Sequence, residues 1–388
     1  MKLFYLFSAT AVMLTACSGS SSNTEKDSSK KDSAQYTLAD KKDFTQTIDA
    51  KPVGLYVLKN QGIEATITNY GGRLVNLLVP DKNGNPTDVI VGPGTLQQFI
   101  DSKEPYYGAT IGRYGNRIAK GKFTLDGKTY TLAINNAPNS LHGGKKGFQY
   151  VIWNAEQPSD SVLTLSYLSK DGEEGFPGNL NVKVSYTLTK DTTMRIDYEA
   201  TTDKPTVCNL TNHAYYNLNG YNAGTAMNHI LQMYANSYTP VDSTLIPFGK
   251  IEPVAGTPLD FTTPQSIGAR VNDTNNIQIK NGKGYDHNYV LNQNAGNALQ
   301  KAATVKGDKS GIVLTIFTQE PGLQFYSGNF MHGKNAMKGN SNDEYRAAIA
   351  LEPQHFPDSP NQPQFPSTEL KLGETYKTTS IYKFSVEK

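Results

Sequence analysis

Only two cysteines occur in the 388 residues, Cys17 and Cys208, and this scarcity excludes a fold held together by a disulfide framework. The formal charges nearly cancel, at +2, so the composition gives no reason to expect nucleic acid or a strongly acidic partner. After the first residues there is no long apolar run, so no later segment is expected to span a membrane. The folded part is therefore expected to bind neither nucleic acid nor a lipid bilayer.

Several catalytic motifs are absent as well. The sequence has no His-x-His, His-Glu-x-x-His or Cys-x-x-Cys spacing, which argues against a catalytic zinc ion. It has no Gly-x-Ser-x-Gly elbow for a serine nucleophile, and no glycine-rich loop of the kind that binds nucleotides. We therefore expect chemistry without a metal or cofactor, although loop oxygens could hold a structural Ca²⁺, since such sites leave weak traces in a sequence.

The N-terminus has the features of a secretion signal. Lys2 precedes an apolar run, residues 3–16, that is too short for a membrane span and has the length of a signal peptide. The run ends in Leu14-Thr15-Ala16-Cys17, which resembles the bacterial lipobox, so residues 1–17 are predicted to be a lipoprotein signal peptide with Cys17 as its acylation site. Ordinary cleavage near Ala16 is the alternative.

The residues after Cys17 predict where the protein works. Ser18, rather than Asp, follows the cysteine, and by resemblance to known sorting rules this favours the outer membrane or periplasm of a Gram-negative cell envelope. Residues 18–40 are rich in Ser, Lys and Asp and are predicted to form a flexible tether. Residues 41–388 are predicted to form one folded domain that acts as a monomer. If Cys17 is acylated, Cys208 has no partner and no intramolecular disulfide is expected.

The pattern of the folded part is that of β-strands. Residues 163–167 and 182–188 alternate apolar and polar side chains with period two, and similar runs occur at 195–200, 311–319 and 382–386. Turn signals separate such runs: residues 81–86, 125–128 and 170–172, of which the Asp-Gly pairs are the stronger hairpin signals. Helices are expected only at 94–103 and 264–271. These features predict an all-β fold, a single large antiparallel β-sandwich.

Acid–base chemistry is the class that these exclusions leave. Three of the six histidines, His142, His213 and His287, lie in polar, Gly- or Asn-rich segments, where binding sites tend to be built on a rigid scaffold. Glu352 is predicted to follow the end of an apolar strand, with prolines stiffening the loop behind it. Partial desolvation there would raise its pKa toward the range of a general base. From these residues alone, a surface glutamate at the end of a strand is an equal alternative.

A set of motifs in a fixed order resembles the aldose 1-epimerase (galactose mutarotase) family, over roughly residues 44–388. The motifs are Asn69-Tyr70-Gly71-Gly72, Gly112-Arg113-Tyr114-Gly115-Asn116-Arg117-Ile118-Ala119, Asn139-Ser140-Leu141-His142-Gly143-Gly144, Asp171-Gly172-Glu173-Glu174-Gly175-Phe176-Pro177-Gly178, Thr211-Asn212-His213, Thr239-Pro240-Val241-Asp242, Tyr285-Asp286-His287-Asn288, Gly322-Leu323-Gln324-Phe325-Tyr326 and Leu351-Glu352-Pro353-Gln354. Each motif alone is weak, and together they are specific. Pro353 departs from the family, in which Thr or Gly commonly follows the base.

The resemblance implies a β-sandwich with an open cleft for a free hexose, such as D-glucose or D-galactose, and an isomerase that interconverts its α and β anomers. Glu352 resembles the base that takes the proton from the O1 hydroxyl, and His213 the acid that protonates the ring oxygen O5. The carboxylate is expected to keep His213 protonated, with coupled titration of the pair. The sugar hydroxyls are expected to be held by Asn116, Arg117, His142, Asp286 and Gln324.

Three other functions use the same residues. A glycoside hydrolase would use two carboxylates, for example Asp286 and Glu352, whose separation would predict an inverting or a retaining mechanism. A non-catalytic carbohydrate-binding protein could share the fold, because a fold does not fix an activity. An epimerase of phosphorylated sugars is disfavoured by the predicted periplasmic location.

Overall fold

The computed structural model describes residues 38–292 and 298–387. The predicted signal peptide, with Cys17, lies outside these residues, as does most of the predicted tether.

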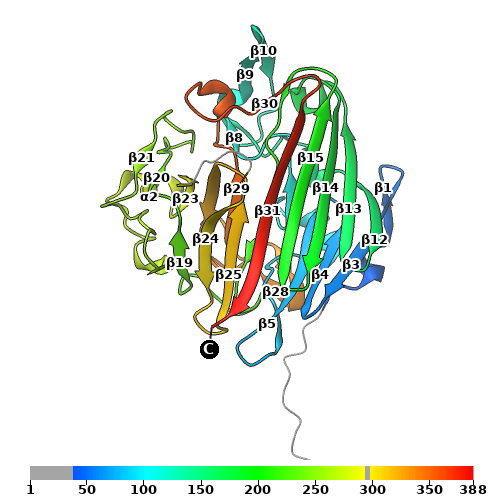
Figure 1. The fold of residues 1–388 in the computed structure, drawn as a ribbon, viewed down its shortest axis with the longest axis vertical. Coiled ribbons are helices and arrows are strands. Elements are labelled where there is room, and N and C mark those ends of the chain that lie inside the picture. Colours follow the sequence, from blue (N-terminus) through cyan, green and yellow to red (C-terminus); the bar gives the residue numbers. More distant parts are fainter. Residues whose placement is uncertain (1–37, 293–297, 388) are drawn as a thin grey trace, which may run out of the picture. The chain divides into compact units, whose positions relative to one another are not determined.

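Strongly alternating strands build a nine-stranded antiparallel sheet (Figure 1). Its order is β12 (Asn154–Ser159), β13 (Val162–Ser169), β14 (Leu180–Thr189), β15 (Thr193–Thr202), β31 (Thr375–Val386), β25 (Ile312–Thr318), β24 (Gln300–Lys306), β19 (Ile230–Met233) and β22 (Gln265–Ser266). Side chains of β14 alternate between buried and more exposed positions along its whole length, so one face of the sheet is apolar. The predicted strand runs all fall on strands of this sheet.

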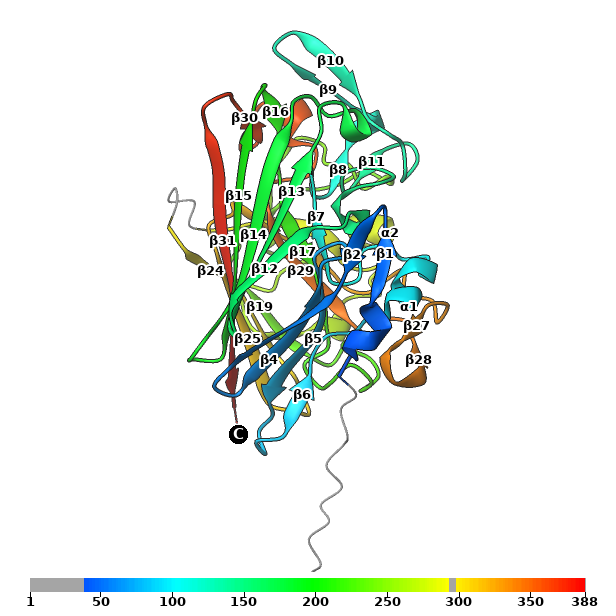
Figure 2. The ribbon, with the colours of Figure 1, turned by 90° about the vertical axis from the view of Figure 1, so that its right-hand side faces the viewer.

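Two smaller antiparallel sheets pack against that apolar face. One has the order β18 (Tyr215–Tyr216), β29 (Ile349–Gln354), β26 (Gly322–Tyr326), β23 (Asp286–Val290), β20 (Ser237–Tyr238) and β21 (Glu252–Pro253); the other has the order β3 (Leu55–Asn60), β4 (Ile63–Thr68), β5 (Arg73–Pro80) and β6 (Pro86–Asp88). Figure 2 shows β31, β15 and β14 on the left, β29 to their right, and β4 and β5 below. Val184, Leu351 and Leu77 belong to one hydrophobic core, so the expected all-β sandwich is confirmed.

Short hairpins and helical turns connect the sheets. The two-stranded pairs are β1 (Gln46–Ile48) with β2 (Lys51–Val53), β7 (Ala109–Ile111) with β17 (Thr211–His213), β8 (Arg117–Ile118) with β11 (Ser140–Leu141), β9 (Lys122–Leu125) with β10 (Lys128–Thr131), β16 (Thr206–Val207) with β30 (Glu369–Leu370), and β27 (Ala336–Met337) with β28 (Ser341–Asn342). The 3₁₀ turns are η1 (Lys41–Phe44), η2 (Ala119–Gly121), η3 (Phe148–Tyr150), η4 (Glu173–Gly175), η5 (Ile267–Ala269), η6 (Lys338–Asn340) and η7 (Ser359–Asn361). The Asp126-Gly127 pair forms the tight turn between β9 and β10, as predicted.

The helices differ in part from the prediction. Helix α1 (Leu96–Asp101) lies within the predicted segment, and the Thr95 side chain caps it. The predicted helix at 264–271 is wrong: the segment forms β22 and η5, because the backbone N–H groups of Ile267 and Gly268 donate to carbonyls of the segment before β19. The sequence analysis missed helix α2 (Ile277–Gly282), which the Asn276 side chain caps. Among the described residues, no helix combines the length and apolar character needed to cross a bilayer.

Glu352 lies inside β29, not after its end, which corrects the sequence prediction. The strand continues through Pro353, which pairs opposite Leu323 of β26. Proline is tolerated there because the other ladder of β29, with β18, involves only Ile349 and Ala350. The Glu352 side chain is 2% exposed, so the alternative of a surface glutamate is wrong as well.

Candidate active site

A cleft of about 660 Å³ opens beside the six-stranded sheet. Six of the seven residues predicted to bind or convert a sugar line it: Asn116, Arg117, His142, His213, Asp286 and Glu352. The seventh, Gln324, does not line the cavity but donates from Nε2 to Oδ1 of Asp286 at 2.6 Å. The fold thus brings together residues that are up to 236 positions apart in the sequence.

The register of the six-stranded sheet sets one wall of the cleft. Gln324 of β26 pairs directly opposite Glu352 of β29, and Asn288 of β23 pairs opposite Gln324. Asp286 lies two residues before Asn288, so its side chain is on the same face as those of Gln324 and Glu352. The next residue, His287, points to the other side and is fully buried against the Tyr238 ring. The alternation along β23 therefore assigns Asp286 to the cleft and His287 to the core.

Asn116 and His142 hold the opposite wall through reciprocal hydrogen bonds. They flank the short pair of strands β8 and β11, and both have positive φ, at 66° and 48°. The His142 N–H donates to the Asn116 carbonyl at 3.0 Å, and the Asn116 N–H donates to Nδ1 of His142 at 3.1 Å. The Asn116 side-chain oxygen accepts from the Arg117 N–H. The backbone and side chain of Asn116 together hold His142 and the backbone of Arg117 in position.

The hydrogen bond to Nδ1 decides which proton His142 offers to a ligand. Burial lowers the pKa of His142 well below its ordinary value, and the neighbouring His213 and Arg117 lower it further, so the ring is neutral. A neutral imidazole that accepts at Nδ1 carries its proton on Nε2. His142 therefore presents an N–H donor to the cleft, which suits a sugar hydroxyl oxygen.

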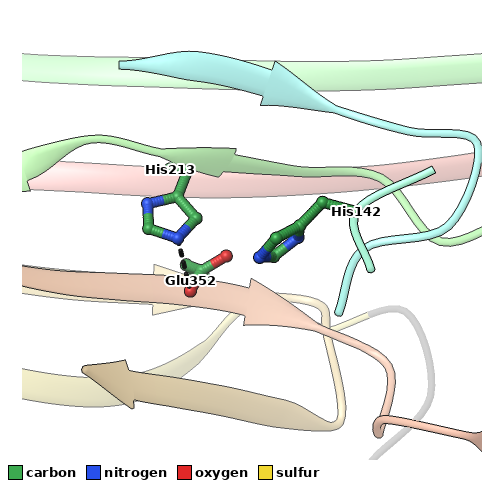
Figure 3. A group of neighbouring side chains, drawn as sticks. All are labelled: His142, His213 and Glu352. Carbon is green, nitrogen blue, oxygen red and sulfur yellow. Dashed lines mark ion pairs between the residues drawn. The ribbon is translucent and has the colours of Figure 1, made fainter. Parts of the chain in front are cut away.

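His142, His213 and Glu352 approach one another closely enough to resemble a metal site (Figure 3). One potential ligand atom from each lies within 4.8 Å of the others. Motif spacing could not reveal this cluster, since its members come from three distant segments. The tautomer of His142 opposes metal binding, because a histidine that ligates through Nε2 needs an acceptor at Nδ1, and here a backbone N–H occupies Nδ1.

His213 and Glu352 form a buried pair at the floor of the cleft. Nε2 of His213 lies 3.5 Å from Oε1 of Glu352, along the dashed line in Figure 3. Burial lowers the pKa of His213 to about 3 and raises the pKa of Glu352 well above its usual value. Negative charge on Asp286 raises the Glu352 pKa further, whereas Arg117 opposes the rise. Burial therefore favours the neutral form of both groups in the free protein.

This protonation state differs from the expectation that Glu352 would keep His213 charged. Desolvation disfavours the charged form of both buried groups, which favours a proton on the carboxyl group over one on the imidazole. The pair nonetheless has the proton that an acid–base mechanism needs, and a shift from Glu352 to His213 would produce the ionic form. The cost of that charge separation falls when a polar ligand enters the cleft.

Aromatic rings fix His213 in place. The rings of Tyr215 and Tyr106 lie nearly parallel to its imidazole, with centroids at 5.0 Å and 5.7 Å. Tyr106 also packs against His142 at 4.5 Å. His213 ends β17, and its carbonyl accepts from the Gly108 N–H. One tyrosine thus contacts both imidazoles of the cleft.

Arg117 and Asp286 supply charge on opposite walls. Nε of Arg117 donates to the Asn136 side chain at 3.1 Å, which aims the rest of the guanidinium group toward the cleft that it lines. Burial raises the pKa of Asp286, and both Arg117 and the Gln324 amide oppose this rise. A cation and a hydrogen-bonded carboxylate facing one cavity match the donors and acceptors of a polyol.

Cys208, His229 and His355 do not line the cleft. Cys208 is buried, and burial raises the pKa of its thiol, as expected of an inert cysteine. His229 lies between the Leu218 N–H and the Asp308 carboxylate, and His355 contacts Glu320 at 2.6 Å. Among the residues that line the cleft, the histidines are His142 and His213.

Sequence reasoning missed part of the lining, above all Glu104 and Tyr106. Both belong to Glu104-Pro105-Tyr106-Tyr107-Gly108, which precedes β7. The available signal was a proline followed by two aromatic residues in a connection between a helix and a strand. It carries no histidine, so an inspection that started from the histidines passed over it.

Known proteins resemble this chain over most of its length. A family described as aldose 1-epimerase matches residues 54–383. The galactose mutarotase of Rattus norvegicus is 41% identical over 333 residues, covering 85% of this chain and 94% of that protein. The aldose 1-epimerase of Escherichia coli strain K12 is 37% identical over 343 residues, covering 87% and 97%. A solved aldose epimerase homologue from C. elegans, 31% identical, superposes with a TM-score of 0.80 and covers 87% of this chain and 100% of its own.

Proposed function

The chain belongs to the aldose 1-epimerase family, and we propose that it interconverts the α and β anomers of free hexoses such as D-glucose and D-galactose, with Glu352 as the base and His213 as the acid. It is an isomerase that acts on carbohydrates. The observation that carries the residue assignment is the buried His213–Glu352 pair, 3.5 Å apart at the floor of a polar cleft.

Ring opening and ring closure each move one proton at O1 and one proton at O5. Glu352 takes the proton of the O1 hydroxyl while His213 delivers one to O5. The C1–O5 bond then breaks, and C1 becomes an aldehyde carbonyl. Rotation about C1–C2 presents the other face of the carbonyl. On closure, His213 recovers the O5 proton as O5 attacks C1, and Glu352 returns a proton to O1, so nothing is consumed.

The sugar itself shifts the proton of the pair toward the reactive form. An O1 hydroxyl that donates to Glu352 stabilises the carboxylate, and an O5 lone pair that accepts from His213 stabilises the imidazolium. In the empty protein, Oε2 of Glu352 has no hydrogen-bond partner among the described residues. A hydroxyl donor would satisfy that oxygen and offset its desolvation.

The other cleft residues are proposed to hold the remaining hydroxyls. His142 donates from Nε2, Arg117 donates from its guanidinium, and Asp286 accepts while Gln324 fixes its orientation. Asn116 acts chiefly by positioning His142 and Arg117. Hydroxyl groups both donate and accept hydrogen bonds, so donors on one wall and an acceptor on the other together orient the ring. We propose that no cofactor takes part and that the protein acts as a monomer; a structural Ca²⁺ stays a prediction.

Two alternatives receive less support from the geometry. A glycoside hydrolase would pair Glu352 with a second reacting carboxylate, but Glu352 lies 3.5 Å from the imidazole of His213, and Asp286 is engaged by Gln324. A purely sugar-binding protein has no need of a buried acid–base pair, whose desolvation costs stability.

We also propose that the protein is an envelope lipoprotein, anchored through Cys17 to the outer membrane and facing the periplasm. The support is the sequence Leu14-Thr15-Ala16-Cys17 after a short apolar run, followed by Ser18. Residues 18–40 would then serve as the tether between the lipid and the domain.

Polarimetry tests the proposed activity directly. The purified full-length protein is added to freshly dissolved α-D-glucose or α-D-galactose, and the approach to the equilibrium rotation is followed against the spontaneous rate. We expect a rate proportional to enzyme concentration with both sugars. Binding of the sugars without acceleration would contradict the proposal in favour of a carbohydrate-binding protein.

A further inference from the structure

Glu104 is a third carboxyl group of the cleft, beside Asp286 and Glu352. It is half-buried in the wall formed by the connection between α1 and β7. Its Oε1 accepts from the Tyr106 N–H at 3.3 Å, and its own carbonyl accepts from the Ser102 hydroxyl at 2.7 Å. Both the backbone and the carboxyl group of Glu104 are therefore held in position.

A buried arginine clamps the segment that carries Glu104. The guanidinium of Arg73 is 1% exposed and donates to the carbonyls of Pro105 at 2.9 Å and of Tyr107 at 2.8 Å. It also donates to the Gln149 carbonyl at 2.7 Å, across the same wall. Because three carbonyls use its N–H groups, Arg73 fixes the backbone around Glu104 without forming an ion pair with the carboxyl group.

Within the described residues, no lysine or arginine nitrogen lies within 4.0 Å of the Glu104 carboxylate. The ion pairs found there involve other acids: Asp40, Glu64, Asp49, Asp197, Asp171, Glu352, Asp308, Glu387, Asp88, Glu320 and Asp191. Burial raises the pKa of Glu104 to about 7; the Tyr106 N–H, Arg73 and the Tyr215 hydroxyl oppose this rise, and Asp343 adds to it. A partly desolvated carboxylate with no cation beside it costs stability in the free protein.

We propose that Glu104 is a further sugar-binding residue, whose carboxylate accepts a hydrogen bond from a hexose hydroxyl other than O1. The inference rests on the proposed epimerase function and extends its binding site. Among the described residues, no hydrogen bond or ion pair joins the Glu104 carboxyl group to His213 or Glu352; the link runs through Tyr106, whose N–H donates to Glu104 at 3.3 Å and whose ring packs against His213 at 5.7 Å. Its partner on the sugar is therefore a hydroxyl at a position that does not react, and its contribution is to affinity and specificity.

Deoxy sugars identify that hydroxyl. The full-length wild type and Glu104→Gln are assayed by polarimetry with D-glucose and with its 2-, 3-, 4- and 6-deoxy derivatives. We expect KM of the variant for D-glucose to rise roughly tenfold, because a hydrogen bond to a charged acceptor is lost, while kcat changes less than twofold. For the one derivative that lacks the partner hydroxyl, wild type and variant should have the same KM. Glu156→Gln, an exposed glutamate of β12, is the matched control and should match wild type throughout.

Thermal unfolding separates binding from a structural role. A group kept for ligand binding should cost stability in the empty protein, so Glu104→Gln should unfold about 2–4 °C higher than wild type at pH 8. The difference should vanish near pH 4, where both folded and unfolded Glu104 are protonated. A lower unfolding temperature at pH 8 would assign Glu104 to the scaffold and overturn the proposal. If the glutamine variant does not fold, Glu104→Asp carries the same panel of sugars, with a smaller rise in KM.

The remaining outcomes are also decisive. An equal loss with every deoxy derivative, or a fall in kcat at unchanged KM, would overturn the proposed hydroxyl contact. Unchanged KM values for all the sugars would do the same. A wild type that fails to accelerate anomerisation contradicts the epimerase function instead, and this result is independent of Glu104.

Discussion

Gln324 and Glu352 stand directly opposite each other on neighbouring strands, and Gln324 donates to Asp286 rather than to Glu352. One carboxylate of the wall is thereby held by an amide, while the other lies 3.5 Å from the imidazole of His213. Two acids on the same face of one sheet thus have different tasks, since the held one can orient a hydroxyl and the other can exchange a proton.

Glu352→Gln tests the base. The amide keeps the shape of the side chain but cannot take the O1 proton, so kcat should fall about 10²- to 10⁴-fold. Sugar binding, measured by isothermal titration, should survive. Glu156→Gln again serves as the control, and a rate near that of the wild type would remove Glu352 from the mechanism.

His213→Asn tests the acid. The variant loses the proton donor to O5 and the ring that stacks between tyrosines, so kcat should fall by a similar factor while KM changes little. The measurement is the initial rate over a range of sugar concentrations. A change confined to KM would show that His213 only positions the substrate.

The pH dependence of kcat/KM reports the proton of the pair in the free protein. Burial lowers the pKa of His213 to about 3 and raises that of Glu352, so one proton stays on the pair across the neutral range. Below that range Glu352 cannot take a proton, and above it His213 has none to give. We expect kcat/KM, corrected for spontaneous mutarotation, to change little across the neutral range. A step near pH 6.5, the value of an ordinary histidine, would contradict the burial effect.

Metal ions should neither support nor block the reaction. His142 carries its proton on Nε2 because its Nδ1 accepts from the Asn116 N–H. A protonated Nε2 has no lone pair for a metal ion, so His142 cannot complete a metal site with His213 and Glu352. Dialysis against EDTA should leave kcat unchanged, and micromolar Zn²⁺ should not compete with the sugar. Competitive inhibition by Zn²⁺ would show that His142 can change its tautomer.

Cys17→Ala tests the anchor. The wild type should incorporate labelled palmitate, fractionate with the outer membrane and accumulate as a precursor under globomycin, whereas the variant should incorporate no label. A wild type without label would favour ordinary cleavage near Ala16.

Local patterns predicted the scaffold well and the helices less well. Alternation fixed β13 and β14, because one face of each strand must be apolar wherever a sheet covers a core. The helix predicted at residues 264–271 does not form, because the backbone N–H groups of Ile267 and Gly268 donate to carbonyls of another segment.

For the cleft, the resemblance to a family selected residues that local patterns could not join, since Asn116 and Glu352 meet only in the folded chain. The sequence could not predict that burial favours the neutral forms of the acid–base pair, and the reason is different. This preference depends on how much water reaches His213 and Glu352, and this follows from packing rather than from residue type.

The last strand of the chain has a consequence for the order of folding. β31 lies in the middle of the nine-stranded sheet and pairs with β15 on one side and β25 on the other. The two halves of that sheet are joined only through β31, so the sheet can be completed only after residues 375–386 have been synthesised.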